Sequence, residues 1–207
     1  MSTDAVVLAA NRLAGLSWGD RERRREYSLL LAPWDGEERA ILMAGTQSSC
    51  ALALMAAFLI AEIDGTVRRW RGKEICDPLR EPRWGHYDSL PYLEHLAIQR
   101  GIRKKPNDTT PEFRPGVWFC IGGEPHVGIV VSARDGGWET IEGGQPDPFN
   151  RRPSPQNCTR ILRKVRRLSR RDRRWFVGER PLLYYADAGL LPCANSGMPW
   201  SKLWITP

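Results

Sequence analysis

The spacing of apolar residues predicts helices in the first half of the chain. Residues 4–16 carry an apolar stripe at helical spacing, and Ser2 or Thr3 precedes it as a candidate cap. Residues 50–63 are apolar nearly all round, interrupted only by Glu62, which predicts a helix buried on every side. A third helix is expected over residues 88–100. Between the first two, residues 21–26 read as a charged, exposed stretch, and the short apolar runs 27–34 and 39–44 fit a helix or a hairpin equally well.

The pattern changes to strands in the second half. Short, β-branched or aromatic runs separated by turn residues predict antiparallel strands. They are 116–121, 126–132 and 138–142, with further strands within 157–168 and 175–185. Helices followed by an antiparallel meander indicate an α+β fold in which a helix packs on one face of the sheet. We expect one domain over 1–207, with an inserted segment at about 66–111 and a basic C-terminal extension from about 151.

Composition narrows the classes of function. The chain has 207 residues and a formal charge of +7, and much of the excess lies in 151–174. This segment predicts either a face that binds polyanions or a solvated, arginine-rich strand or turn, and no nucleic-acid motif accompanies it. The apolar run 51–63 is too short to span a bilayer. The N-terminus lacks the features of a signal peptide, so we expect the chain to be made as a cytosolic protein.

Five cysteines are present, and no CxxC pair occurs among them. This argues against a disulfide framework or a zinc cluster. Cys50 stands out because it is predicted at the first turn of a buried helix, with Ser48 or Ser49 as its cap. A helix N-terminus stabilises a thiolate, and its free N–H groups can bind an oxyanion. The alternative is a small buried core residue.

His126 and Glu142 complete a candidate catalytic set. His126 opens an otherwise apolar strand, directly after a Gly-Gly-Glu-Pro turn. If the following hairpin turns within 133–137, residues 141–143 come opposite His126, and Glu142 can orient its ring. Gln145 is an alternative orienting residue. Taken singly, His126 and Glu142 also fit a solvent-facing strand start and an exposed strand-end acid.

Other residues are weaker candidates. Trp84, His86 and Trp118 are expected to line a substrate groove, although surface and core positions also explain them. Cys120 is a fallback nucleophile, but a strand offers it no helix dipole.

Three segments resemble the NlpC/P60 and CHAP group of papain-like amidases. They are GTQSSCALALMAAFLIAE, RPGVWFCIGG and HVGIVVSARDGGWETIEGG, and the resemblance spans roughly Leu13 to Gln145. It implies a papain-like fold with Cys50 as nucleophile, His126 as base and Glu142 as orienting group. A catalytic set of this kind needs no metal or cofactor. Gln47, three residues before Cys50, is a candidate oxyanion donor. Two segments differ from the family pattern: Ser-Cys-Ala-Leu replaces Asp-Cys-Ser-Gly, and Gly-Gln follows Glu-Gly in place of Asn.

The resemblance implies hydrolysis of an amide bond in the stem peptides of bacterial peptidoglycan. Without a signal peptide, such an enzyme fits an antibacterial toxin injected by a type VI-like secretion system, or a phage lysin. It would act in the periplasm or cell wall of a target cell. An immunity protein or a secretion carrier would be its partner, and no specific nucleic acid is expected. Two alternatives are a thiol peptidase or acyltransferase acting on protein or lipid, and a non-catalytic basic binding module.

Overall fold

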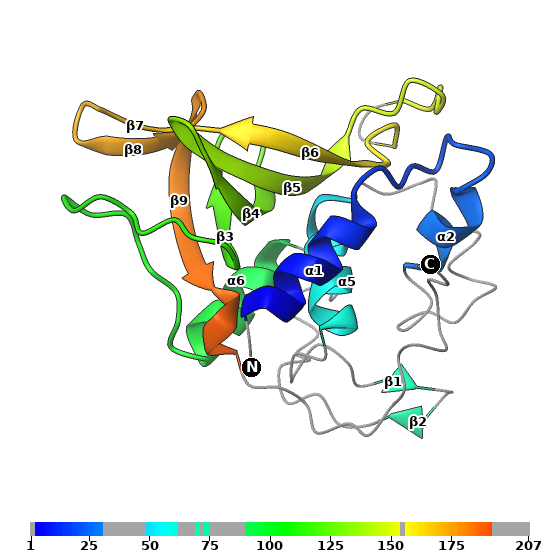
Figure 1. Cartoon of the computed structure of the whole chain (residues 1–207), viewed down its shortest axis with the longest axis horizontal. Helices are drawn as coiled ribbons and strands as arrows, with labels where there is room; N and C mark the ends of the chain where they lie inside the picture. The colour runs from blue at the N-terminus through cyan, green and yellow to red at the C-terminus, as the bar shows by residue number, and fades with distance from the viewer. Residues whose placement is uncertain are drawn as a thin grey trace.

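The α-helices precede the strands of the large sheet along the chain, as the apolar spacing predicts (Figure 1). The computed structural model describes residues 3–30, 49–61, 69–70, 73–74, 90–153 and 156–191. The helical elements are α1 (Thr3–Leu13), α2 (Arg24–Leu29), α5 (Cys50–Ile60), α6 (Leu90–Gln99) and the short 3-10 helix η2 (Ala188–Leu190). Because α1 already includes Thr3, that residue does not precede the helix as a cap. Helix α2 begins within the stretch that was expected to be only charged and exposed.

A small antiparallel pair, β1 (Arg69–Trp70) and β2 (Lys73–Glu74), lies within the predicted insert. The other strands form one antiparallel sheet of seven, in the order β6-β5-β4-β3-β9-β8-β7. Their bounds are β3 (Val117–Ile121), β4 (His126–Arg134), β5 (Gly137–Gln145), β6 (Arg160–Arg166), β7 (Leu168–Arg171), β8 (Arg174–Val177) and β9 (Arg180–Asp187).

The predicted simple meander is wrong for the last strands. Strands β3 to β6 do follow one another across the sheet, but β9 returns to pair with the other edge of β3. The single expected strand over 175–185 is two strands, β8 and β9, separated at Gly178, whose φ of 64° suits a glycine turn. The pairing of β9 with β3 leaves β3 covered on both sides, which a fully buried strand requires.

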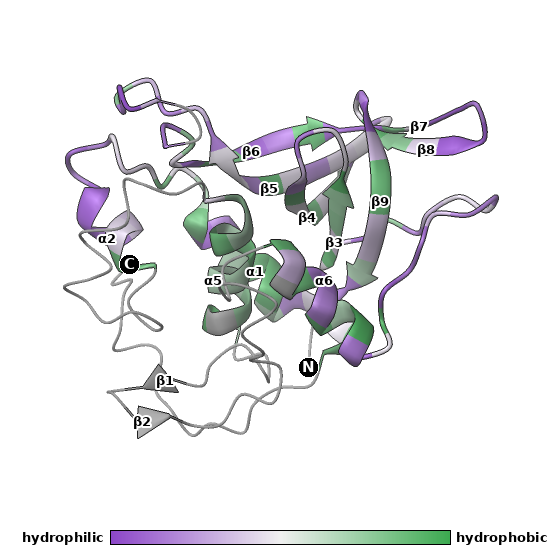
Figure 2. Cartoon of the chain, turned by 180° about the vertical axis from the view of Figure 1, so that it is seen from behind, coloured by the Kyte–Doolittle hydropathy of each residue, from purple (hydrophilic) through white to green (hydrophobic). Residues whose placement is uncertain are grey.

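Each face of the sheet carries its own apolar cluster, because side chains alternate along a strand. Trp118, Val127 and Ile129 belong to the cluster shared with helices α1, α5 and α6, whereas Phe119 and Val130 belong to the opposite one. Helix α5 is apolar all round because α1, α6, β4 and β5 surround it, as the green helices of Figure 2 also indicate.

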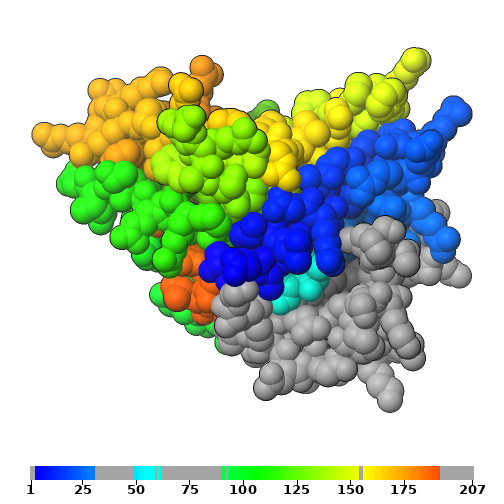
Figure 3. All heavy atoms as spheres, viewed as in Figure 1, coloured from blue at the N-terminus to red at the C-terminus, as the bar shows by residue number. Residues whose placement is uncertain are grey.

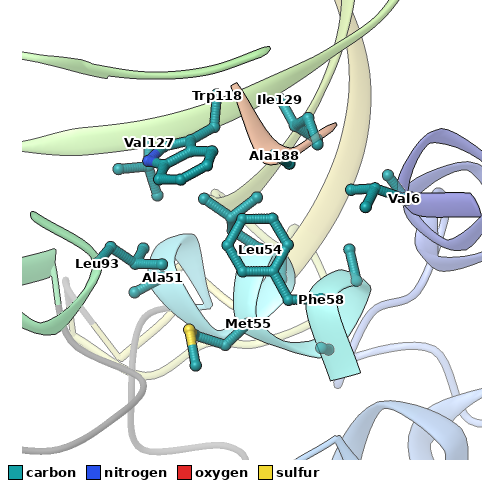
Figure 4. Packing of buried hydrophobic residues seen from close by; sticks show 14 of the residues in the cluster. Val6, Ala51, Leu54, Met55, Phe58, Leu93, Trp118, Val127, Ile129 and Ala188 are labelled. Atoms are coloured by element: carbon teal, nitrogen blue, oxygen red, sulfur yellow. The ribbon is translucent and has the colours of Figure 1, made fainter. Parts of the chain in front are cut away.

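Trp118 was expected to line a substrate groove, and this expectation is wrong. The residue is fully buried on the face of β3 that meets α5, where its indole packs edge-to-face on Phe58 (Figure 4). The two ring centroids lie 5.1 Å apart at an interplanar angle of 67°. The strand's alternation fixes this side chain toward the helices and away from solvent.

The segment after α1 lies along the outer strand of the sheet. Gly15 donates to the carbonyl of Ile161 at 2.8 Å, Ile161 donates back to Leu16 at 2.8 Å, and Ser17 forms a bridge with Arg160. Figure 3 shows these N-terminal residues in blue against the yellow atoms of the β6 region. The contact covers the first part of the edge of β6 and ties α1 to the sheet. Within the described residues, none of the helices has the length and apolar character needed to cross a membrane.

Truncating Phe58 tests the contact between α5 and the sheet. Phe58→Ala should lower the free energy of unfolding by about 3–5 kcal/mol, because it removes a buried ring and leaves a cavity beside Trp118. Leu8→Ala, on the solvent side of α1 where Leu8 is 55% exposed, is the control and should change it by less than about 0.5 kcal/mol. Urea denaturation measures both, and equal effects of the two substitutions would contradict this packing.

Candidate active site

Cys50 is the first residue of α5, as predicted, but Ser49 does not cap the helix with its side chain. The Ser49 carbonyl accepts the first helical hydrogen bond from the N–H of Ala53 at 2.9 Å, which is the position of a cap residue. Its hydroxyl instead accepts from the N–H of Gly144 at 2.7 Å and donates to the carbonyl of Cys158 at 3.5 Å. Ser49 therefore binds the start of the helix to the end of β5. Ser48 lies outside the described residues.

The end of β5 comes unusually close to the start of α5. A Cβ atom on Gly143 would lie 2.0 Å from the Ser49 carbonyl oxygen and 2.8 Å from the Cβ of Ala53, so only glycine fits there. The pairing of β5 with β6 also shifts between Glu142 and Gln145, and Gly144 takes a φ of 65° in this bulge. The two glycines after Glu142 thus let the strand bring its last residues against Cys50.

A loop after β5 holds the other side of the helix start. Asp147 is buried and accepts from the hydroxyls of Ser17 at 2.6 Å and Thr159 at 3.1 Å, and from the N–H of Gly19 at 2.8 Å. This network joins the N-terminal segment to the loop that carries Cys158. The Cys158 carbonyl in turn accepts from the N–H of Ser49 at 3.1 Å. The position of Cys50 is therefore fixed from two sides.

His126 and Glu142 are in direct contact, as the sequence predicts. The Nε2 atom of His126 lies 2.9 Å from Oε2 of Glu142. Gly128 makes this contact possible: it lies on the same face of β4 as His126, and a Cβ there would come 2.7 Å from the Cγ of Glu142. The missing side chain leaves the space in which the carboxylate reaches the imidazole.

Glu142 is fully buried and holds four hydrogen bonds. Besides His126, the hydroxyl of Thr140 donates to Oε1 at 2.8 Å, and Arg166 donates to Oε1 at 2.7 Å and to Oε2 at 2.6 Å. Burial raises the pKa of Glu142, but the bonds from Arg166 and His126 outweigh it and hold the pKa well below the usual range. Glu142 is an anion at any physiological pH.

Arg166 is a site residue that sequence reasoning missed. It was grouped with the basic segment 151–174, for which a solvated or polyanion-binding face was expected. Its side chain is instead only 21% exposed and forms a two-point ion pair with Glu142. Arg166 lies on the same face of β6 as Leu162 and Lys164. Nothing in the local sequence predicts its ion pair, because Glu142 lies on another strand.

The imidazole of His126 contacts Glu142 and lines the same cavity as Cys50. Its Nε2 is the nitrogen that faces the carboxylate. Burial lowers the pKa of His126, while hydrogen bonding with Cys50 and with Glu142 raises it, and the net effect is a pKa above the usual value. The ring is therefore held on one side by a carboxylate that stays ionised.

Gln145, the alternative orienting residue, does not occupy that role. Its amide nitrogen donates to the carbonyl of Gly143 at 3.0 Å and lies 3.3 Å from Nε2 of His126, which already faces Glu142. Its amide oxygen accepts from the ammonium of Lys164. An N–H group cannot accept the imidazole proton, so Glu142 orients the ring and Gln145 forms part of the cavity wall.

A cavity of about 560 Å³ opens over Cys50 and His126. Among the described residues, the other lining positions are Glu124, Pro125, Gly144, Gln145, Cys158, Lys164, Arg166 and Arg180. Three of these are cationic. Gln47, Trp84 and His86, which were predicted as oxyanion or groove residues, lie outside the described residues.

Cys120 is not a competing nucleophile in this geometry. It is buried within β3, and burial raises its pKa to about 11. A thiol with that pKa is almost entirely protonated near neutrality. Over the described ranges, no cluster of His, Cys, Asp and Glu side chains could hold a metal ion.

Comparison with protein-family models gives no match, and comparisons with curated proteins and with solved structures give no significant match either.

Removing the charge of Arg166 should destabilise the protein strongly. Arg166→Met leaves the buried Glu142 carboxylate without its main partner, at an expected cost of about 3–5 kcal/mol in the free energy of unfolding at pH 7. Arg163→Met is the matched control on the same strand. The side chain of Arg163 is 43% exposed, and its partner Glu139 keeps Arg134 as a second partner, so this substitution should cost at most about 1 kcal/mol.

The cost of Arg166→Met should shrink at low pH. In the wild type, the folded pKa of Glu142 is depressed, so the pair stabilises the protein above the unfolded pKa of about 4.3 and that stability is lost as pH falls toward the folded pKa. In the variant, the unpaired buried carboxyl has a raised pKa, so protonation relieves it. Urea titrations at pH 7 and pH 4 measure the difference, and a gap that widens at pH 4 would contradict the ion pair.

Proposed function

We propose that the chain is a cysteine hydrolase of amide bonds, of the papain-like type, with Cys50 as nucleophile, His126 as base and Glu142 as orienting group. The observation that carries the proposal is a buried carboxylate bonded to a histidine that lines one cavity with a cysteine at the start of a buried helix. Each group has the environment its role needs: a fixed anion, a tunable imidazole, and a thiol at a helix N-terminus beside a cavity.

The steps follow from these positions. His126 takes the proton of Cys50, and the α5 dipole and the imidazolium stabilise the thiolate. The thiolate attacks the amide carbonyl, and the N–H groups of the first turn of α5, which have no partner within the helix, stabilise the oxyanion. His126 then passes its proton to the leaving amine. Water attacks the thioester with His126 as base, which releases the acid and restores the thiol.

The proposed substrate is the peptide stem of bacterial peptidoglycan. The resemblance of the segments around Cys50, His126 and Glu142 to cell-wall amidases supports this choice, and a charge of +7 would favour an anionic wall. An enzyme of this kind, delivered to a target cell as a toxin or lysin, would act in the periplasm or wall. Hydrolysis of protein or lipid acyl groups, or binding without catalysis, are the competing outcomes of the assays below.

Cys50→Ala should abolish cleavage of purified muropeptides, with loss of at least about a thousandfold in kcat, because it removes the thiol that forms the acyl-enzyme in the proposed mechanism. Mass spectrometry of the products measures this. Cys158→Ala, which removes the other thiol of the same cavity, is the matched control and should retain activity.

Cleavage that survives in Cys50→Ala would overturn the nucleophile assignment. A second outcome is that the wild type cleaves no stem peptide but forms an acyl-thiol adduct that Cys50→Ala does not form. That outcome would favour a protein or lipid substrate. The absence of both activities would favour a binding module.

Glu142→Gln should lower kcat by about a hundredfold to ten-thousandfold while KM changes less, because the amide cannot hold the imidazole in the correct tautomer. The same substitution should lower the pKa of His126, since Glu142 is one of the groups that raise it. Thr140→Val removes another partner of Glu142 without its charge and is the control, with a smaller loss. NMR titration of the histidines measures the pKa, and an unchanged His126 titration would contradict the contact.

A further inference from the structure

The wall of the cavity over Cys50 carries more positive charge than the catalytic set requires. Lys164, Arg166 and Arg180 line it, against Glu124 as the acidic residue among the described lining positions. Arg166 is neutralised by Glu142 and belongs to the catalytic set. Lys164 and Arg180 are the two cations left over.

Lys164 has a half-buried side chain and no carboxylate within ion-pair distance among the described residues. Its ammonium donates to the Oε1 atom of Gln145, a neutral partner. Burial lowers the pKa of Lys164, Glu142 opposes this, and Arg166 and Arg180 lower it further. An anion bound beside it would relieve that repulsion.

Arg180 is held in place with one part of its guanidinium unused. Its Nε donates to the carbonyl of Gly122 at 2.9 Å, which fixes the group at the start of β9. Its Nη2 is buried and has no hydrogen-bond partner. A buried donor left unpaired is destabilising, so such a group in the wall of an open cavity points to a ligand.

We propose that Lys164 and Arg180 bind a carboxylate of the substrate, adjacent to the amide that Cys50 attacks. This inference rests on the proposed function and names the substrate class: peptides that carry a free carboxylate beside the scissile bond. Arginine and lysine are the side chains that pair with carboxylates, and here both face the cavity that holds the nucleophile. The cavity volume of about 560 Å³ is in the range that holds a few amino-acid residues.

The cations have no role in the proton transfers described above, which Glu142 and His126 carry. In this proposal, the two cations instead select substrates that carry a carboxylate. A neutral carboxamide in place of the carboxylate would leave Nη2 of Arg180 and the ammonium of Lys164 without an anionic partner, so the site would discriminate against it.

Alkylation of Cys50 tests the anion site without any peptide substrate. Iodoacetate and iodoacetamide react with a thiol in the same way but differ by one negative charge. In the wild type, the ratio of their rate constants at Cys50, followed by peptide mapping, should exceed the same ratio for glutathione by about tenfold or more. Lys164→Met and Arg180→Met should each lower the ratio severalfold, and Arg180→Lys should retain most of it.

Arg174→Met is the matched control, because it removes one charge from an exposed position on β8. Its ratio should equal that of the wild type. A wild-type ratio equal to that of glutathione, or one unchanged in both Lys164→Met and Arg180→Met, would overturn the proposal. Thermal unfolding of each variant shows that the comparison is made on folded protein.

Cleavage of a matched pair of stem peptides, one with the carboxylate and one with the carboxamide, separates this inference from the proposed function. A preference for the carboxylate of about tenfold or more in kcat/KM, lost in Lys164→Met and Arg180→Met, supports the inference. Equal cleavage of both peptides overturns the inference and leaves the hydrolase standing. Charge-selective alkylation without cleavage of either peptide overturns the peptidoglycan assignment and leaves the anion site standing.

Discussion

The buried carboxylate of Glu142 is the interaction on which the rest of the site depends. It joins three adjacent strands, because His126 comes from β4, Thr140 from β5 and Arg166 from β6. A charge with no solvent exposure is tolerated only when it is paired and fully hydrogen-bonded. Arg166 supplies the pairing, and this leaves the bond to His126 free to orient the ring. The stability of the sheet and the geometry of the base therefore share one contact.

The close approach of β5 to the start of α5 brings Cys50 into the cavity that His126 also lines. Gly143 removes the side chain that would collide with Ser49, and the hydroxyl of Ser49 then bonds to Gly144 instead of capping its own helix. The consequence is chemical as well as structural. Because the Ser49 side chain is used elsewhere, the first N–H groups of α5 are, in our proposal, left for an oxyanion, and Cys50 at the start of α5 lies beside the end of β5, the strand that carries Glu142.

The cationic residues of the basic segment 151–174 fall into two groups that differ in solvent exposure. Arg166 and Lys164 project toward the cavity from β6, whereas Arg171 and Arg174 stand exposed at the turn between β7 and β8. A net charge of +7 cannot distinguish these positions, because alternate residues of a strand face opposite sides of the sheet. Of the inward cations, Arg166 pairs with the carboxylate of Glu142, and Lys164, in our proposal, acts in the choice of substrate.

The sequence by itself determined the features that depend on local spacing. It predicted the helices before the strands, Cys50 at the first turn of a buried helix, and His126 at the head of its strand with Glu142 in reach across one hairpin. Tertiary structure decided the burial of Trp118, the place of β9 beside β3, and the roles of Arg166, Lys164 and Arg180. The physical reason is that periodicity and turn residues act over a few positions, whereas strand order and register join residues far apart in sequence, and only they decide which charges meet.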